Sequence, residues 1–130
     1  MQSSFIEHVN LTVSDPKRTA VMLHDIFGWT IRWEGPSLGD GYTVHVGTDT
    51  HYLAVYSRGV SNEGCKETYV TKGGLNHVGI VVDDLDAVEQ RVIDAGYKPE
   101  NHGDYEPGRR FYFDDHDGIE FEVVSYGAAQ

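Results

Sequence analysis

The stretch IEHVNLTV at residues 6–13 returns as LNHVGIVV at residues 75–82, and this repetition decides how the rest of the chain is interpreted. Each copy alternates apolar residues with other residues, as a half-buried strand does. Each copy also carries a histidine at the same position, His8 in the first and His77 in the second. Two related segments separated by 69 residues indicate duplicated modules.

The closing segments of the two copies match as well, because DTHYLAVYS at residues 49–57 aligns with DGIEFEVVS at residues 117–125. Between its opening and closing segments, each copy carries one set of helix signals and two further strand-like runs, which predicts the order β-α-β-β-β. The expected organisation is one domain of residues 1–130, with modules at 5–57 and 75–126 and a linker at 58–74.

Start and stop signals place one helix in each module. Asp15 and Pro16 form a typical helix start and Gly28 a typical end, and Asp84 and Gly96 do the same in the second module. The expected apolar helix faces consist of Val21, Met22, Ile26 and Phe27, and of Leu85, Val88, Val92 and Ile93. Further strands are expected at residues 29–33, 42–47, 51–56, 97–99, 110–114 and 119–125, with a turn region at 35–41 and a loop at 101–108.

Each module can bury one face of its sheet under its helix, which leaves the opposite face in need of a cover. Two such sheets that pair side by side form a trough, and the helix-free faces then line a cavity where ligands collect. The expected fold is therefore α+β, with two tandem βαβββ modules whose sheets pair into a half-barrel.

Charge and composition narrow the class of partner. The net charge of −11 would repel a phosphate backbone, so we expect no nucleic acid. No apolar run approaches the ~20 residues of a membrane helix, so we expect no membrane span. Cys65 is the only cysteine, which excludes an internal disulfide. A small molecule is the expected partner and the cytoplasm the default location.

Strand alternation brings three possible metal ligands to one face. His8 and His77 point away from the apolar sides of the opening strands, and Glu122 points away from the apolar side of the closing strand. Two imidazoles and one carboxylate with open coordination positions suit Fe, Mn, Zn or Ni. The alternative is that these are packing residues inherited with the repeat. Among the other histidines, we expect His45 on the helix-facing side of its strand.

Further residues are expected around the same cavity. Tyr52 and Tyr56 point inward and would form an aromatic wall, and Asn10 shares the side of His8. Arg110 also points inward, where it either binds an anionic group or balances Glu120. His102 lies in the expected loop over the second module, where it is a candidate acid–base or substrate contact at the cavity mouth.

The chain resembles the vicinal oxygen chelate superfamily, which includes glyoxalases, bleomycin-binding proteins, extradiol dioxygenases and fosfomycin resistance transferases. Residues 6–13, 75–82 and 111–122 carry the resemblance, which extends over residues 5–126. It implies metal ligands at His8, His77 and Glu122, a substrate contact or proton donor at Tyr112, and a homodimer.

Departures from the family pattern narrow what the resemblance implies. The fourth ligand position of glyoxalases falls on Ala54, which cannot coordinate, and the usual proline of the last turn is His116. A three-ligand site is similar to that of the dioxygenases and the fosfomycin transferases. The leading hypothesis is therefore a divalent-metal enzyme acting on an oxygen-chelating substrate, with dioxygenase-like chemistry first. The alternatives are a fosfomycin-type thiol transferase, a metal-free drug-binding protein that holds an aromatic ligand between Trp33, Tyr52 and Tyr56, and a catalytically silent relative.

Overall fold

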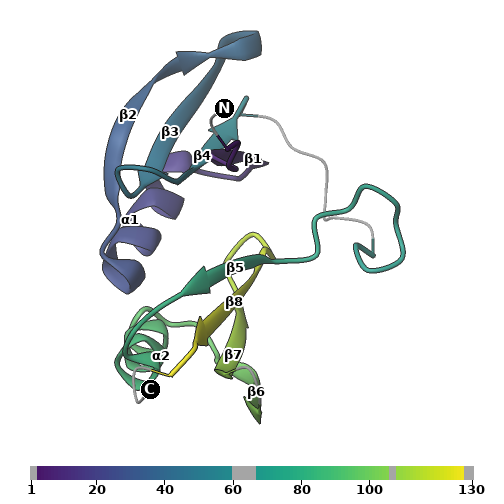
Figure 1. Ribbon diagram of the computed structural model, residues 1–130. Helices are drawn as coiled ribbons and strands as arrows, with labels where there is room; N and C mark the ends of the chain where they lie inside the picture. The colour runs from purple at the N-terminus through teal and green to yellow at the C-terminus, as the bar shows by residue number, and fades with distance from the viewer. Residues whose placement is uncertain (1–2, 60–66, 106–107, 128–130) are drawn as a thin grey trace. The chain divides into compact units, whose positions relative to one another are not determined.

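The computed structural model describes residues 3–59, 67–105 and 108–127, so Cys65 lies outside the described residues. The chain divides into two compact units, Met1–Asn62 and Glu63–Gln130. Each unit contains one α-helix and a four-stranded sheet (Figure 1). Neither α-helix has the length and apolar character that a membrane span requires.

The first unit has the expected β-α-β-β-β order, with a short 3-10 helix, η1, inserted between its second and third strands. In its sheet the strand order is β1-β4-β3-β2, with β1 parallel to β4 and the other neighbours antiparallel. The elements are β1 (His8–Thr12), α1 (Pro16–Phe27), β2 (Thr30–Ser37), η1 (Leu38–Asp40), β3 (Gly41–Gly47) and β4 (Tyr52–Ser57).

The second unit repeats this plan. Its strand order is β5-β8-β7-β6, again with the first strand parallel to the last. The predicted α+β fold of two βαβββ modules is therefore confirmed. The elements are β5 (Val78–Val81), α2 (Leu85–Asp94), β6 (Glu100–Tyr105), β7 (Gly108–Asp114) and β8 (Glu120–Ser125).

Both helices begin where the sequence signals place them. The side chain of Asp15 accepts a hydrogen bond from the backbone N–H of Arg18, and that of Asp84 accepts one from Ala87. These bonds satisfy N–H groups that have no partner within the helix. The first helix ends at Gly28, whose φ of 75° is a left-handed conformation that glycine adopts without strain.

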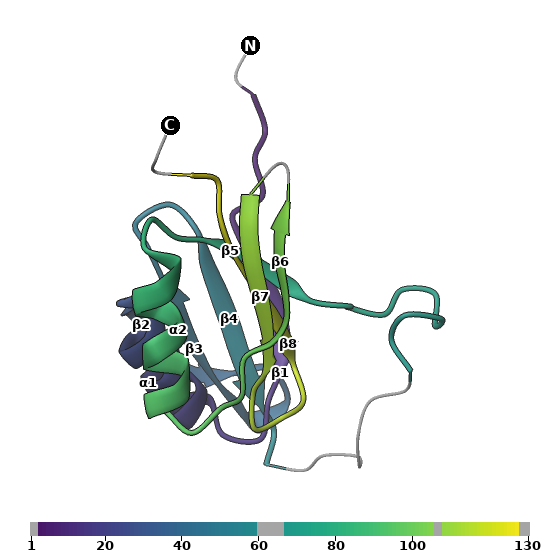
Figure 2. The same cartoon turned by 90° about the horizontal axis from the view of Figure 1, so that it is seen from below.

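Each helix covers one face of its own sheet, and we call the opposite face the open face (Figure 2). Val21 and Ile93 were expected on the apolar helix faces, but their side chains are 56% and 48% exposed, which corrects the expectation. Only a stripe along each helix contacts the sheet, and Val21 and Ile93 lie beyond the edge of that stripe. The buried side chains include Leu23, Ile26, Val44, Val46, Leu53 and Val55 in the first unit, and Val88, Val92, Phe111, Phe113, Phe121 and Val123 in the second.

Two strands differ from their expected limits. The second strand of unit one continues to Ser37, into the expected turn region. Strand β6 occupies Glu100–Tyr105, where a loop was expected, and no strand forms at 97–99. Backbone pairing with β7 holds this polar segment in an extended conformation, because cross-strand hydrogen bonds override the weak strand preference of its residues.

The turn between β7 and β8 is closed by a buried carboxylate. Asp115 Oδ1 accepts hydrogen bonds from the backbone N–H groups of Asp117 and Ile119, at 2.8 and 2.9 Å. Burial raises the pKa of the Asp115 carboxyl, and the backbone hydrogen bonds only partly offset that effect. The turn sets the antiparallel register in which Tyr112 lies opposite Glu122.

We expect Asp115→Asn to gain stability relative to the wild type as pH rises from about 3 to 7. Below the unfolded carboxyl pKa of about 3.9, both proteins are neutral at this position. Above it, the folded wild type holds the proton more tightly than the unfolded chain does, so wild-type stability falls until the raised folded pKa is passed. The asparagine oxygen can still accept both backbone hydrogen bonds.

Urea unfolding of both proteins across this pH range measures the difference. Asp49→Asn, in the corresponding turn of the first unit, is the matched control because Asp49 is exposed. A stability difference between wild type and Asp115→Asn that stays constant with pH would contradict the assignment.

Candidate metal and substrate site

A histidine–carboxylate pair lies on the open face of the second unit. His77 Nε2 and Glu122 Oε1 are 3.1 Å apart. Tyr112 is opposite Glu122 in the β7–β8 register, and its ring meets the His77 ring edge-on at a centroid distance of 5.8 Å. The structure therefore brings three of the predicted site residues together.

The spacing of the pair suits a metal ion. A nitrogen and an oxygen that each bind one ion at about 2.1 Å, at right angles to each other, lie about 3.0 Å apart. The distance between His77 Nε2 and Glu122 Oε1 matches this value without rearrangement of either strand.

The other ring nitrogen of His77 faces a tyrosine and a second carboxylate. Tyr69 donates a hydrogen bond from its hydroxyl to Glu120 Oε1 at 2.5 Å, and the same hydroxyl oxygen is 3.3 Å from His77 Nδ1. The hydrogen bond to Glu120, with burial, raises the pKa of Tyr69 to about 12. Sequence reasoning missed Tyr69, because it belongs to the segment interpreted as a linker; an aromatic residue eight positions before His77 was the available signal.

Arg110 holds the second oxygen of Glu122. Its Nη1 donates to Glu122 Oε2 at 2.8 Å, and the two side chains are only 13% and 14% exposed. Sequence reasoning left Glu120 as a possible partner, but Arg110 pairs with Glu122. Arg110 Nε and Nη2 are buried and have no hydrogen-bond partner among the described residues. The guanidinium lies 5.2 Å from the centroid of the Tyr105 ring.

The Tyr112 hydroxyl is protonated at neutral pH. Burial raises the pKa of its hydroxyl, and the negative charge of Glu122 raises it further. The group therefore stays protonated in this range and can donate a hydrogen bond to a bound oxygen atom.

The open face of the first unit carries an aromatic stack. The ring of Tyr52 lies between those of His8 and His45, at centroid distances of 4.9 and 4.6 Å. The guanidinium of Arg32 lies 4.4 Å from the centroid of Tyr52, within cation–π range. The Trp33 ring lies 5.1 Å from His45 and is tilted by 54° relative to it.

The position of His45 corrects the expectation that it faces the helix. Its neighbours Val44 and Val46 are fully buried against the helix, so alternation along β3 turns His45 to the open face. The pattern Val-His-Val in the sequence contained this signal.

The other residues predicted in the first unit lie on the same sheet face. Strand pairing places His8 opposite Tyr52, Asn10 opposite Ala54 and Thr12 opposite Tyr56. The Tyr56 hydroxyl donates to the backbone carbonyl of Leu38 at 2.6 Å, which ties this side chain to the start of η1. Asn10 is exposed.

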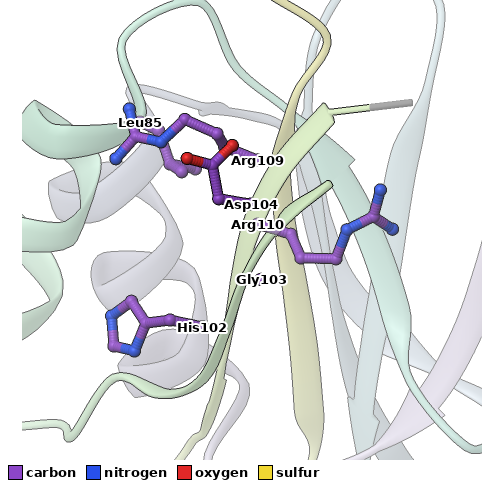
Figure 3. A pocket seen from close by; sticks show the side chains of 6 residues that line it. All are labelled: Leu85, His102, Gly103, Asp104, Arg109 and Arg110. Atoms are coloured by element: carbon purple, nitrogen blue, oxygen red, sulfur yellow. The ribbon is translucent and has the colours of Figure 1, made fainter. Parts of the chain in front are cut away.

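His102 lies away from the His77–Glu122 pair. Its Nε2 is 2.8 Å from Glu89 of α2, and its ring stacks on buried Phe111 at a centroid distance of 6.0 Å, on the helix-covered side of the sheet. Figure 3 shows His102 on one side of the β6–β7 pair and Arg110 on the other. Both residues line a hollow of about 200 Å³.

A bulge explains this placement of His102, which we expected at the cavity mouth. Glu100 pairs with Tyr112 and Gly103 with Arg110, so three residue steps on β6 oppose two on β7. Asn101, with φ of 53°, occupies the bulge. The extra residue shifts the alternation and turns His102 towards α2.

The candidate ligands are divided between the two units. His77 and Glu122 belong to the second, and His8 to the first, where its Nδ1 is 2.9 Å from Glu7 Oε1. Within residues 3–59, 67–105 and 108–127, no group of three or more histidine, cysteine, aspartate or glutamate side chains is assembled to hold a metal ion.

Known proteins share this fold. A family model described as the glyoxalase/bleomycin resistance protein/dioxygenase superfamily matches residues 5–123. A solved glyoxylase/bleomycin resistance protein/dioxygenase domain from Frankia sp. EAN1pec is 22% identical, with a TM-score of 0.81 over 96% of this chain and 99% of that one. No curated protein matches the chain.

Two further structures are similar in fold. One is a variant of the fosfomycin resistance protein FosX from Listeria monocytogenes, complexed with Mn(II) and 1S,2S-dihydroxypropylphosphonic acid; it is 19% identical, with a TM-score of 0.73 over 95% of this chain and 93% of that one. The other is a glyoxalase I variant from Zea mays, which is 22% identical, with a TM-score of 0.67. The match covers 92% of this chain and 45% of the Zea mays chain.

We expect the Arg110–Glu122 pair to contribute more to stability than the Arg109–Asp86 pair, although both have N–O distances close to 2.9 Å. The first pair is sheltered from water, whereas the second is 51% and 75% exposed, where solvent weakens ion pairs. Arg110→Met and Glu122→Gln, made singly and together, give the coupling between the two side chains from urea unfolding midpoints. The same cycle with Arg109→Met and Asp86→Asn is the control. An equal or larger coupling in the exposed pair would refute the expectation.

Proposed function

The chain belongs to the glyoxalase/bleomycin resistance protein/dioxygenase superfamily, and on that basis we propose that it is a divalent-metal enzyme whose small-molecule substrate binds the metal through oxygen atoms. The observation that carries this proposal is the 3.1 Å approach of His77 Nε2 to Glu122 Oε1 on the open face of the second unit. The distance suits two ligands of one ion.

The proposed ligands are His8, His77 and Glu122, around Fe, Mn, Zn or Ni. Two imidazoles and a carboxylate leave coordination positions open to a ligand. In such a site the ion acts as a Lewis acid on a bound oxygen atom. Whether His8 is the third ligand is part of the test below.

The chain's own residues supply binding and proton donation. Tyr112, held protonated beside Glu122, donates a hydrogen bond to a substrate oxygen. The free Nε and Nη2 donors of Arg110 bind an anionic group of the substrate. Tyr52 and Tyr56 offer aromatic surface, and Asn10 a polar contact. His102, which lies beside α2, has no part in this arrangement.

Dioxygenase-like chemistry is our first choice within the family. Ala54 at the fourth ligand position argues against a glyoxalase-type site. Thiol transfer of the fosfomycin type is the next choice, and the FosX variant bound to Mn(II) and a diol supports Mn(II) as the first ion to test. Oxygen uptake with a catechol, set against thiol consumption with an epoxide, separates the two reactions.

A second candidate function is metal-free binding of an aromatic compound. The stack of His45, Tyr52 and His8, with Trp33 tilted beside it, supports it, because a flat ligand can continue such a stack. Under this proposal, an aromatic compound quenches Trp33 fluorescence in protein stripped of metal, and Glu122→Gln leaves its affinity unchanged. A homodimer and a cytoplasmic location stay predictions under either function.

We expect protein purified without chelator to bind about one Mn(II) per chain, and His77→Ala or Glu122→Gln to remove that binding because each deletes a ligand. Elemental analysis and calorimetry measure the stoichiometry, and near-ultraviolet circular dichroism checks folding. His102→Ala is the matched control, since this imidazole lies on the helix-covered side. His8→Ala tests the third ligand. Unchanged Mn(II) affinity in folded His77→Ala would overturn the metal site.

A further inference from the structure

Both candidate histidine ligands have an acidic group beside the same ring nitrogen. In the first unit, Glu7 Oε1 lies 2.9 Å from His8 Nδ1. In the second, Tyr69 lies between His77 Nδ1 and Glu120, and Glu120 Oε1 itself is 3.9 Å from that nitrogen. The two arrangements use different residues from different elements, so simple copying of the repeat does not explain them.

The hydrogen bonds made by Tyr69 indicate where the ring proton of His77 lies. The Tyr69 hydroxyl has one hydrogen, and it is donated to Glu120. The Tyr69 oxygen can therefore only accept from His77, which requires the ring proton to be on Nδ1. Nε2 then directs its lone pair at Glu122 Oε1, 3.1 Å away. Two facing lone pairs repel each other unless a proton or a metal ion lies between them.

The same reasoning applies more directly to His8. A carboxylate can only accept a hydrogen bond, so Glu7 places the proton of the neutral ring on Nδ1 and leaves Nε2 free. The Tyr52 hydroxyl also reaches Glu7 Oε1, at 3.5 Å, and its ring stacks on His8. These two contacts restrict the orientation of the His8 ring.

We propose that Glu7 and the Tyr69–Glu120 pair are positioning residues that keep the proton on Nδ1 of His8 and His77, so that both rings present Nε2 to the metal. This inference rests on the proposed metal site. Residues behind metal-binding histidines commonly work in this way, by fixing the tautomer and the ring orientation. The inference assigns a function to Tyr69, which lies outside the strands and helices of the fold.

The first test reads the tautomer directly in metal-free protein. Long-range ¹H–¹⁵N correlation spectra at about pH 9, where ordinary imidazoles are neutral, distinguish Nδ1–H from Nε2–H. We expect a measurable Nδ1–H population for His77 in the wild type, because the Tyr69 oxygen accepts at Nδ1 and competes with Glu122 at Nε2. In Tyr69→Phe the acceptor at Nδ1 is gone, so the Nδ1–H population is lost and the proton stays on Nε2, bonded to Glu122. Glu7→Gln should loosen the preference of His8 in the same way.

The second test measures Mn(II) affinity by calorimetry, with Mn(II) electron paramagnetic resonance as the signature of the bound ion. Tyr69→Phe, Glu120→Gln and Glu7→Gln should each weaken binding roughly 10- to 100-fold, the usual effect of losing such a partner. Glu89→Gln is the matched control, because it removes the carboxylate beside His102 on the other side of the sheet and should leave Mn(II) affinity unchanged. Urea midpoints confirm that each variant is folded.

The outcomes separate this inference from the proposed function. A wild-type protein that binds no metal overturns the enzyme proposal, while the tautomer spectra still decide whether Tyr69 and Glu7 position the rings. Wild-type Mn(II) binding with an unchanged His77 tautomer and unchanged affinity in folded Tyr69→Phe overturns the inference and leaves the metal site intact. A tautomer change together with weaker binding supports both.

Discussion

The alternation of side chains along each strand is the constraint on which this structure depends. A single helix covers one face of each sheet, so every second residue is committed to the core and the residues between are committed to the open face. In β7, Phe111 and Phe113 are buried under α2 while Tyr112 lies on the open face. A slip of one residue would bury the tyrosine and expose both phenylalanines, so core and site share one register.

The two open faces have diverged on a common scaffold. That of the first unit carries aromatic and imidazole rings stacked around Tyr52, with Arg32 over the stack. That of the second collects charge, with Glu122 between Arg110 and His77. Arg110 supplies a positive partner to Oε2 of Glu122, and the His77 ring lies beside Oε1. Equivalent strands of the two modules therefore present different side chains on their open faces.

Much of the site followed from local patterns. The repeat and its two-residue period predicted the module order and the shared face of His77, Tyr112 and Glu122, because alternation needs no knowledge of neighbouring strands. The helix starts at Asp15 and Asp84 followed from capping, which acts within one turn. The family model supports the resemblance that the same motifs carried.

The sequence by itself determined the family, the two βαβββ modules and, where no bulge interrupts a strand, the alternation of its residues between the two faces, since these depend on short-range periodicity. Only the tertiary structure decided which side chains meet. The bulge at Asn101 turned His102 towards α2, and Tyr69, from a segment without regular structure, came to lie between His77 and Glu120. Bulges and contacts of this kind arise from pairing between strands and from packing of residues distant in the chain, which no local pattern encodes.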